Sequence, residues 1–339
     1  MTTYNVEGSV TDSTGQVSIQ VSGQMTIGSS QPTNNPPPPP VNPPPPPPPP
    51  PPPSGGKVAN FIGADSGPTG AHGQSVSDIQ SADSTIGPDR LVKYFYSGSL
   101  PGTWVGSVPE AITKAIPGTA IIVCWNSLMA QSALEQFCSS IPAGQIVGFS
   151  WQSEQEGAYS GASGAARFIQ GWNNQVDSIR KVGNNNLLAI PTSEVYQYAA
   201  GVNSVAQAGA YLPDASHVDV YGVDVYYHEK GGGGAWPSNG LANYNRFQTW
   251  LSLVEKKSPG AKICLAEYGI DSCLESTNPG IRANRLKQDV AYLRANLKDR
   301  VWGWCYWWRN MSATDCAHMY KFTDTETVGT WKKIANGSL

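Results

Sequence analysis

Three consecutive runs decide the fold: IVGFSW (146–151), FIQGWNNQVDSIRKV (168–182) and LLAI (187–190). The first and third are short apolar runs of the kind that form buried strands. The long middle run repeats its large apolar residues every three or four positions, at Phe168, Trp172, Val176 and Ile179. Residues with that spacing share one face of a helix. The stretch therefore predicts a strand–helix–strand unit.

The same order of short apolar runs and helical segments recurs from residue 57 to residue 339. Eight runs are predicted to be strands: Val58–Gly63, Leu91–Tyr96, Ala120–Trp125, Ile146–Trp151, Leu187–Ile190, Val218–Val225, Lys262–Ala266 and Val301–Tyr306. A second helical run, Arg282–Leu297, lies between the last two. Eight strands alternating with helices predict an α/β fold, a (β/α)8 TIM barrel. A doubly wound open sheet is the alternative, but it normally has fewer strands, and no GxGxxG sequence follows the first run.

A proline-rich segment, residues 31–56, precedes the predicted barrel. Seventeen of the 28 prolines lie between residues 32 and 53. Oligoproline adopts an extended polyproline II helix, because proline fixes φ and has no amide donor. At about 3.1 Å per residue, Pro36 to Pro53 would span roughly 56 Å. The segment is predicted to be a semi-rigid polyproline linker between two folded segments, and docking to a proline-binding domain is the alternative.

Residues 1–30 carry two runs with strand character, Tyr4–Val10 and Val17–Val21. Apolar and polar residues alternate in the second run, as they do in a half-buried strand. Asp12–Gly15 between the runs is a turn sequence. So small a β segment cannot bury enough apolar surface to fold alone. We expect it to pair with copies of itself or with a larger assembly, and a disordered tail is the alternative.

Composition argues against several classes of function. The net charge of −3 argues against nucleic acid, whose phosphates require a clustered basic surface. No apolar stretch of about 18 residues is present, which predicts no membrane span. The first 30 residues lack the pattern of a conventional secretory signal. The six cysteines form no CxxC pair and only four histidines occur, so we predict neither a metal site nor a cofactor.

The candidate site consists of the polar and aromatic residues that follow the predicted strands, since a TIM barrel carries its active site at the C-terminal strand ends. Candidates for substrate contacts are Asp65, Trp125, Asn126, Trp151, Glu156, Asp224, Tyr226, Tyr227, Trp304 and Trp307. Two carboxyl groups carry the argument: Glu154 after the fourth strand and Glu267 after the seventh. Glycoside hydrolysis needs such a pair, one to protonate the leaving oxygen and one to attack the anomeric carbon or to activate water.

Three segments, LAEYG (265–269), VDVYYH (223–228) and WGWCYWW (302–308), carry a family resemblance. The chain from residue 57 onward resembles the clan of retaining glycosidases with (β/α)8 barrels. The resemblance implies that Glu267 is the nucleophile, that Glu154 is the acid/base, and that Tyr226 or Tyr227 donates a hydrogen bond to the nucleophile. It further implies an endo-acting hydrolase of a polysaccharide or a cell-envelope glycan.

The fourth strand departs from the clan's pattern. The clan usually has Asn directly before the acid/base, whereas Ser153 precedes Glu154 here. Glu156 is the reserve acid, because in an extended segment it would point to the same side as Glu154.

The arrangement of the whole chain looks like that of a bacteriophage tail protein: a short β segment, a stiff linker and a sugar-directed barrel. This layout implies an enzyme carried on a virion and projected toward a cell envelope. A secreted enzyme with a non-classical export route, acting on plant polysaccharide, is the alternative.

Structural roles are the alternative for several candidate residues. Glu156 and Glu194 are expected to be solvated loop carboxylates, and Asp224 is equally suited to contact substrate or to cap the next element. Trp304 and Trp307 are equally suited to the core, since alternate residues of a barrel strand point inward and outward; at least one is expected at the barrel mouth. For the whole chain, the alternative is a barrel without catalysis that binds carbohydrate or forms part of a virion.

Two of the six cysteines are placed where they could form a disulfide. Cys273 and Cys316 follow the seventh and eighth predicted strands and would lie in adjacent loops. We therefore predict a disulfide between them, provided that the protein works outside a reducing cytosol.

Overall fold

The computed structural model describes residues 2–11, 17–27, 61–65, 75–88, 90–153, 159, 163–199, 205–227, 237, 239–273, 275, 277–308, 316 and 320–338. The chain divides into two units, Met1–Pro50 and Pro51–Leu339.

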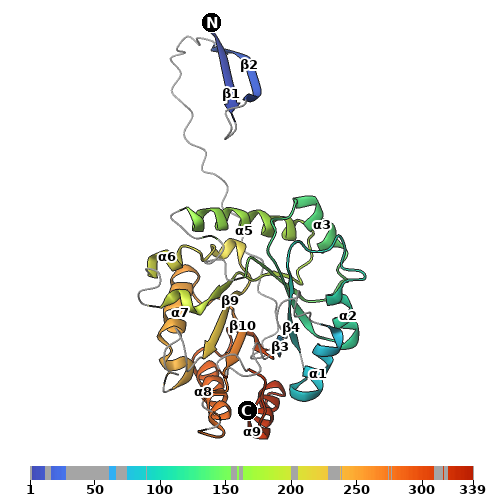
Figure 1. The fold of residues 1–339 in the computed structure, drawn as a ribbon, viewed down its shortest axis with the longest axis vertical. Helices are drawn as coiled ribbons and strands as arrows, with labels where there is room; N and C mark the ends of the chain where they lie inside the picture. Colours follow the sequence, from blue (N-terminus) through green and yellow to red (C-terminus); the bar gives the residue numbers. More distant parts are fainter. Residues whose placement is uncertain are drawn as a thin grey trace, which may run out of the picture. The chain divides into compact units, whose positions relative to one another are not determined.

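The first unit contains an antiparallel pair of strands, β1 (Thr2–Thr11) and β2 (Val17–Ile27) (Figure 1). Their register runs from Thr2 opposite Ile27 to Val10 opposite Ile19. Both runs that the sequence predicted are strands, and each strand is longer than predicted. The predicted turn between them lies outside the described residues.

The second unit is built on one parallel sheet that closes into a barrel. Its strands are β3 (Phe61–Asp65), β4 (Leu91–Tyr96), β5 (Ala120–Trp125), β6 (Val147–Trp151), β7 (Leu187–Ala189), β8 (Thr192–Glu194), β9 (Tyr221–Tyr227), β10 (Ile263–Ile270) and β11 (Val301–Trp307). The strand order is β7-β6-β5-β4-β3-β11-β10-β9-β8. The predicted (β/α)8 barrel is therefore confirmed.

The fifth barrel strand is divided into β7 and β8, and this division closes the barrel. β7 pairs with β6, while β8 pairs with β9. Between them, the amide of Ile190 donates to the carbonyl of Phe149 on one side. The carbonyl of Pro191 accepts from the amide of Gly222 on the other side. Proline has no amide donor. The chain therefore changes its partner strand from β6 to β9 at Pro191, a residue that could not donate a hydrogen bond to either strand.

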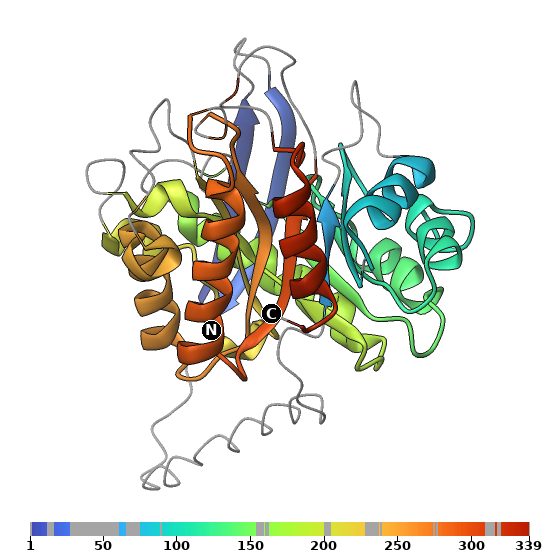
Figure 2. The ribbon, with the colours of Figure 1, turned by 90° about the horizontal axis from the view of Figure 1, so that it is seen from below.

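Helices surround the strands (Figure 1). They are α1 (Val76–Ile86), α2 (Val108–Ala115), α3 (Gln131–Ser139), α5 (Gly164–Lys181), α6 (Val205–Gly209), α7 (Asn245–Lys257), α8 (Ile281–Asn296) and α9 (Thr325–Ala335), with short 3-10 turns η1 (Val195–Tyr198), η2 (Ala215–His217) and η3 (Gly240–Asn243). α8 and α9 lie side by side on the outside of the barrel (Figure 2). The periodic residues that predicted α5 are all buried, as are those that predicted α8: Phe168, Trp172, Val176, Ile179, Leu286, Val290, Leu293 and Leu297.

The apolar core has an inner and an outer part. The inner part fills the barrel and includes Ile122, Cys124, Cys264, Ala266 and Trp302. The outer part lies between the strands and the helices and holds most of the large aromatic side chains. Which face of each strand a residue occupies therefore decides whether it can reach the barrel mouth.

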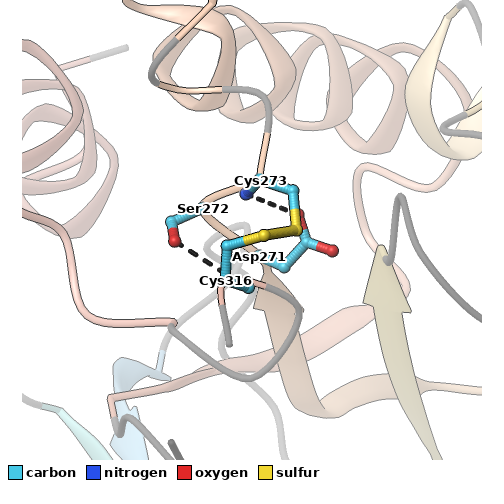
Figure 3. Close-up of a disulfide and its surroundings, with 4 residues drawn as sticks. All are labelled: Asp271, Ser272, Cys273 and Cys316. Carbon is cyan, nitrogen blue, oxygen red and sulfur yellow. Dashed lines mark hydrogen bonds between the residues drawn. A yellow bond between two sulfur atoms is a disulfide. The ribbon is translucent and has the colours of Figure 1, made fainter. Parts of the chain in front are cut away.

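A disulfide joins Cys273 and Cys316, as predicted (Figure 3). The amide of Cys273 donates to the Asp271 carboxylate at 3.2 Å, and the amide of Ser272 donates to the carbonyl of Cys316 at 3.2 Å. The bridge therefore connects the segments that follow β10 and β11. The other four cysteines, Cys124, Cys138, Cys264 and Cys305, are buried and do not take part in this disulfide.

We expect Cys273→Ser to lower the free energy of unfolding by about 2–4 kcal/mol, because the disulfide closes a long loop and restricts the unfolded chain. The two joined cysteines are 43 residues apart. Urea unfolding of the oxidised wild type and of the variant measures the difference, and mass spectrometry of the non-reduced protein shows the bridge. Free thiols at both positions in protein kept under oxidising conditions would contradict the pairing.

Within the described residues, no helix is both long and apolar enough to cross a membrane.

Candidate active site

A cluster of charged side chains lies inside the barrel around Lys93 of β4. Its ammonium group is 2.6 Å from Oε1 of Glu267 and 3.3 Å from both carboxylate oxygens of Asp224. It also donates to Oγ of Ser153 at 3.2 Å. Lys93 and Asp224 are fully buried, and Glu267 is 5% exposed. One lysine thus connects β4, β9, β10 and the end of β6 across the barrel.

Both oxygens of the Glu267 carboxylate accept hydrogen bonds. Oε1 accepts from Lys93, and Oε2 accepts from the hydroxyl of Tyr226 on the neighbouring strand β9. An ammonium and a hydroxyl on opposite oxygens fix the orientation of the carboxylate.

A β-bulge in β10 turns Glu267 into the barrel. Cys264 and Ala266 belong to the inner core, whereas Leu265 between them belongs to the outer core. Strict alternation would place Glu267 on the outer face, beside Leu265. The register with β9 shifts between Leu265 and Glu267, so Ala266 is an extra residue in β10. Such bulges re-aim side chains next to active sites, and this one brings Glu267 to Lys93.

A third carboxyl group, that of Glu194, lies beside the cluster. Glu194 is the last residue of β8 and is paired in register with Asp224, which is itself paired with Glu267. Burial raises the pKa of the Glu194 carboxyl. The hydrogen bond from Gln197 opposes this rise, and the charge of Glu267 adds to it. Three carboxyl groups thus follow one another across β8, β9 and β10, and Glu194 is not the solvated loop residue expected from the sequence.

The structure separates the two tyrosines that the sequence left as alternatives. Tyr226 donates to Glu267, whereas Tyr227 turns to the outer face and donates to Asp289 of α8 at 3.0 Å. This arrangement corrects the expectation that Tyr227 contacts substrate. Asp224 faces Lys93 inside the barrel, so it does not serve as the helix cap that was the alternative.

Three of the four candidate tryptophans lie away from the barrel mouth. Trp151 stacks on Phe168 of α5, and Trp125 packs edge-on against Phe149. Trp304 packs against Tyr268 and Trp331, the latter on α9. All three are about 1% exposed and belong to the outer core. Their expected contact with substrate is therefore corrected: they pack the barrel against its helices.

The remaining candidates differ in position. Trp307 meets the ring of Tyr226 edge-on at 6.1 Å and is 6% exposed, so of the two candidate tryptophans on β11 it is the one near the cluster. Asn126 is exposed just after β5, and Asp65 ends β3 in register with Trp307. Glu154 and Glu156 lie outside the described residues.

Lys93 and the aromatic ring next to it were not among the residues predicted from the sequence. Phe95 is partly exposed, and its ring centre is 4.9 Å from the Lys93 ammonium group. The available signal was a lysine in the middle of the strand LVKYFY, where burial of an unpaired charge would be costly. A buried lysine therefore implies buried carboxylates opposite it. In this cluster its ammonium group lies between the carboxylates of Asp224 and Glu267.

No protein-family model and no curated protein matches the sequence. Solved structures do resemble it. A xyloglucan-specific endo-β-1,4-glucanase of glycoside hydrolase family 5, from a metagenomic library, is 14% identical, covers 81% of this chain and 97% of its own, and superimposes with a TM-score of 0.55. A family 26 glycoside hydrolase from Muricauda sp. is 15% identical over 82% of this chain and 86% of its own, with a TM-score of 0.51. A family 26 β-mannanase from Bacteroides ovatus is 13% identical over 83% and 89%, with a TM-score of 0.51. The barrel unit of this chain therefore has the TIM-barrel fold that these glycoside hydrolases share.

Proposed function

We propose that the barrel unit is a retaining, endo-acting glycoside hydrolase of a polysaccharide or a cell-envelope glycan. The observation that carries this proposal is the Glu267 carboxylate. It lies inside the barrel and is held by Lys93 on one oxygen and by Tyr226 on the other. A carboxylate with fixed orientation suits attack on an anomeric carbon. The likeness of the fold to glycoside hydrolases agrees with this role.

The proposed mechanism is a double displacement. Glu267 attacks the anomeric carbon and forms a glycosyl-enzyme ester, while Glu154 protonates the departing glycosidic oxygen. Glu154 then removes a proton from water, which attacks the same carbon and releases Glu267. Ser153, which precedes Glu154, accepts from the same lysine that contacts Glu267. Glu156 is the second candidate for the acid.

Proton NMR of the first products tests the stereochemical part of the proposal. The full chain is incubated with a panel of soluble β-glucans, mannans and bacterial envelope glycans. With the one that it cleaves, the new reducing end is expected to have the anomeric configuration of the bond that was cut. An inverted anomer formed first would contradict the role of Glu267 as nucleophile and would make it the base of a single displacement.

A carbohydrate-binding barrel without hydrolysis is the second candidate function. The observation that favours it is the 2.6 Å contact of Glu267 with the Lys93 ammonium group, because a tightly paired carboxylate is a weaker nucleophile. Ser153 in place of the clan's Asn points the same way. Saturable binding of a glycan by a wild-type chain that releases no product would support this candidate over the enzyme.

For the biological setting, we propose that the first unit anchors the chain to a larger assembly such as a phage tail, outside the cell. The support is a separate antiparallel strand pair joined to the barrel unit through the proline-rich sequence. The test compares the full chain with one lacking residues 1–35. The shortened chain is expected to be absent from purified particles while keeping its activity. Equal incorporation of both chains would contradict the anchor.

A further inference from the structure

We propose that Asp289 of α8 is a positioning residue, which holds β9 and β10 from outside the barrel so that Tyr226 and Glu267 meet inside it. This inference rests on the proposed function of Glu267. Two tyrosines next to Tyr226 and Glu267 carry the proposal. Tyr227 follows Tyr226, Tyr268 follows Glu267, and both donate to the same carboxylate oxygen of Asp289, at 3.0 and 2.5 Å.

The two strands are thus linked through side chains on both faces. Inside the barrel, the Tyr226 hydroxyl donates to Glu267. Outside it, Asp289 bridges the next residue of each strand. α8 lies against the side of the barrel that β9 and β10 form (Figure 1). The outer bridge therefore fixes how far β9 and β10 are shifted along each other, and with this shift the positions of Tyr226 and Glu267, which form the inner contact.

Such a restraint is needed at this point because the ladder between the strands is irregular. The register of β10 with β9 shifts between Leu265 and Glu267, and its register with β11 shifts between Leu265 and Tyr268. At a bulge, backbone bonds alone fix the orientation of a residue less well than a regular ladder does. Tyr268 directly follows the bulge, so its bond to Asp289 holds the strand where the ladder is interrupted.

The Asp289 carboxylate is fully buried and has a third donor. Its other oxygen accepts from the amide of Leu241 in η3 at 2.7 Å. Gly240 allows this approach: it has a φ of +56°, and a Cβ at this position would lie 1.9 Å from that oxygen. Asp289 thereby also attaches η3, which precedes α7, to the outside of β9.

The charged and titratable groups around Asp289 are consistent with an accepting carboxylate. Burial raises the pKa of Tyr227 and of Tyr268 well above the tyrosine value, so both hydroxyls remain donors. Arg285 of α8 lies over the Tyr227 ring at 5.3 Å, and Tyr244 of the η3 end is the other titratable neighbour. Burial raises the pKa of Asp289 to about 6; the bonds from Tyr268 and Leu241 and the charge of Arg285 oppose this rise. At neutral pH Asp289 is therefore ionised.

The experiment removes the bridge stepwise and measures kcat and KM separately. Tyr268→Phe and Tyr227→Phe each delete one hydroxyl, and Asp289→Asn removes the charge while preserving shape. We expect kcat to fall about tenfold in each phenylalanine variant and about 10²-fold in Asp289→Asn, with KM changed less than about threefold, because a misplaced reacting group costs rate and not ground-state binding.

The matched control is Tyr221→Phe. Tyr221 is also a buried tyrosine of β9, but its hydroxyl donates to the carbonyl of Pro213 at 2.8 Å, away from Asp289. It should lose stability as Tyr227→Phe does and yet keep its kcat. Equal kcat in Tyr268→Phe, Tyr227→Phe and Tyr221→Phe would overturn the proposal and leave Asp289 a purely structural residue.

A second readout does not depend on hydrolysis. Amide hydrogen exchange of β10 is expected to accelerate at least tenfold in Tyr268→Phe, relative to β5 of the same protein, and to stay unchanged in Tyr221→Phe. If the wild type cleaves no glycan but β10 responds in this way, the proposed function fails while the outer bridge stands. If the exchange of β10 is the same in all variants, the outer bridge fails whatever the activity.

Discussion

Glu267→Gln is expected to reduce kcat by about 10⁴-fold or more, because a neutral amide is a far weaker nucleophile than the carboxylate that forms the covalent intermediate. Glutamine has the shape of glutamate and can still accept from Tyr226, so the barrel should remain folded. Lys93 keeps Asp224 as a partner at 3.3 Å. Binding of a glycan should therefore survive while turnover is lost. Initial rates and the affinity for the uncleaved glycan, measured on the same preparation, separate the two effects.

The control for this variant is Glu326→Gln on α9, where the side chain is 57% exposed and paired with Lys287. It changes the net charge by the same amount far from the cluster and should keep the wild-type rate. Glu267→Ala offers a further check, because a small anion such as azide can occupy the space of the missing carboxylate. Azide should then restore turnover and give a glycosyl azide. Full activity of Glu267→Gln would rule out the proposed mechanism.

Lys93→Met is expected to lower the free energy of unfolding by about 3–5 kcal/mol, because it leaves two buried carboxylates without their cation. Lys93 and Asp224 are fully buried, so water cannot replace the missing charge as it does at a surface. Urea unfolding followed by tryptophan fluorescence measures the loss. Turnover should fall as well, since one oxygen of Glu267 loses its donor.

Two companion variants identify the cause of that loss. Lys93→Met combined with Asp224→Asn removes one of the uncompensated charges and should recover part of the stability. Lys287→Met breaks an exposed ion pair, whose members are 44% and 57% exposed, and should cost no more than about 1 kcal/mol. A loss of under about 1 kcal/mol in Lys93→Met itself would contradict the view that this lysine neutralises the interior of the barrel.

The helices and strands could be predicted because their signals are local. The apolar spacing in α5 needs only about fifteen residues of sequence to be recognised, and the four residues that it placed on one face, Phe168, Trp172, Val176 and Ile179, are all buried. The disulfide was predictable for a related reason, since both cysteines follow strands that had to be neighbours. Strand order in a TIM barrel follows chain order, so adjacency of β10 and β11 came from the fold alone.

The charged cluster was harder to predict because its contacts join distant parts of the chain. Lys93 is 131 residues from Asp224 and 174 from Glu267. No local pattern reports such a pairing, although a lysine inside an apolar strand indicates that one exists. Glu194 was undervalued for the same reason: its neighbour Asp224 is supplied by another strand.

The orientation of the strand tryptophans could not be predicted for a different reason. A strand's sequence gives its alternation but not which set of residues faces inward. Ser150 of β6 bonds to Thr192 inside the barrel, and this places Trp151 outside. The register between β10 and β11 shifts. Knowing which face one residue occupies therefore does not predict the faces of the residues that follow it in the strand. Bulges depend on pairing with neighbours and leave no mark in the sequence of one strand.

The state of the six cysteines has a practical consequence for fluorescence work. Two are joined to each other, and the other four are buried, so the native, oxidised protein presents no accessible thiol. A single cysteine introduced near the start of the chain would react alone with a maleimide dye. Energy transfer from that dye to an acceptor attached at a second introduced cysteine on the barrel surface, such as at Lys287, would report the distance between the two labelled units, molecule by molecule.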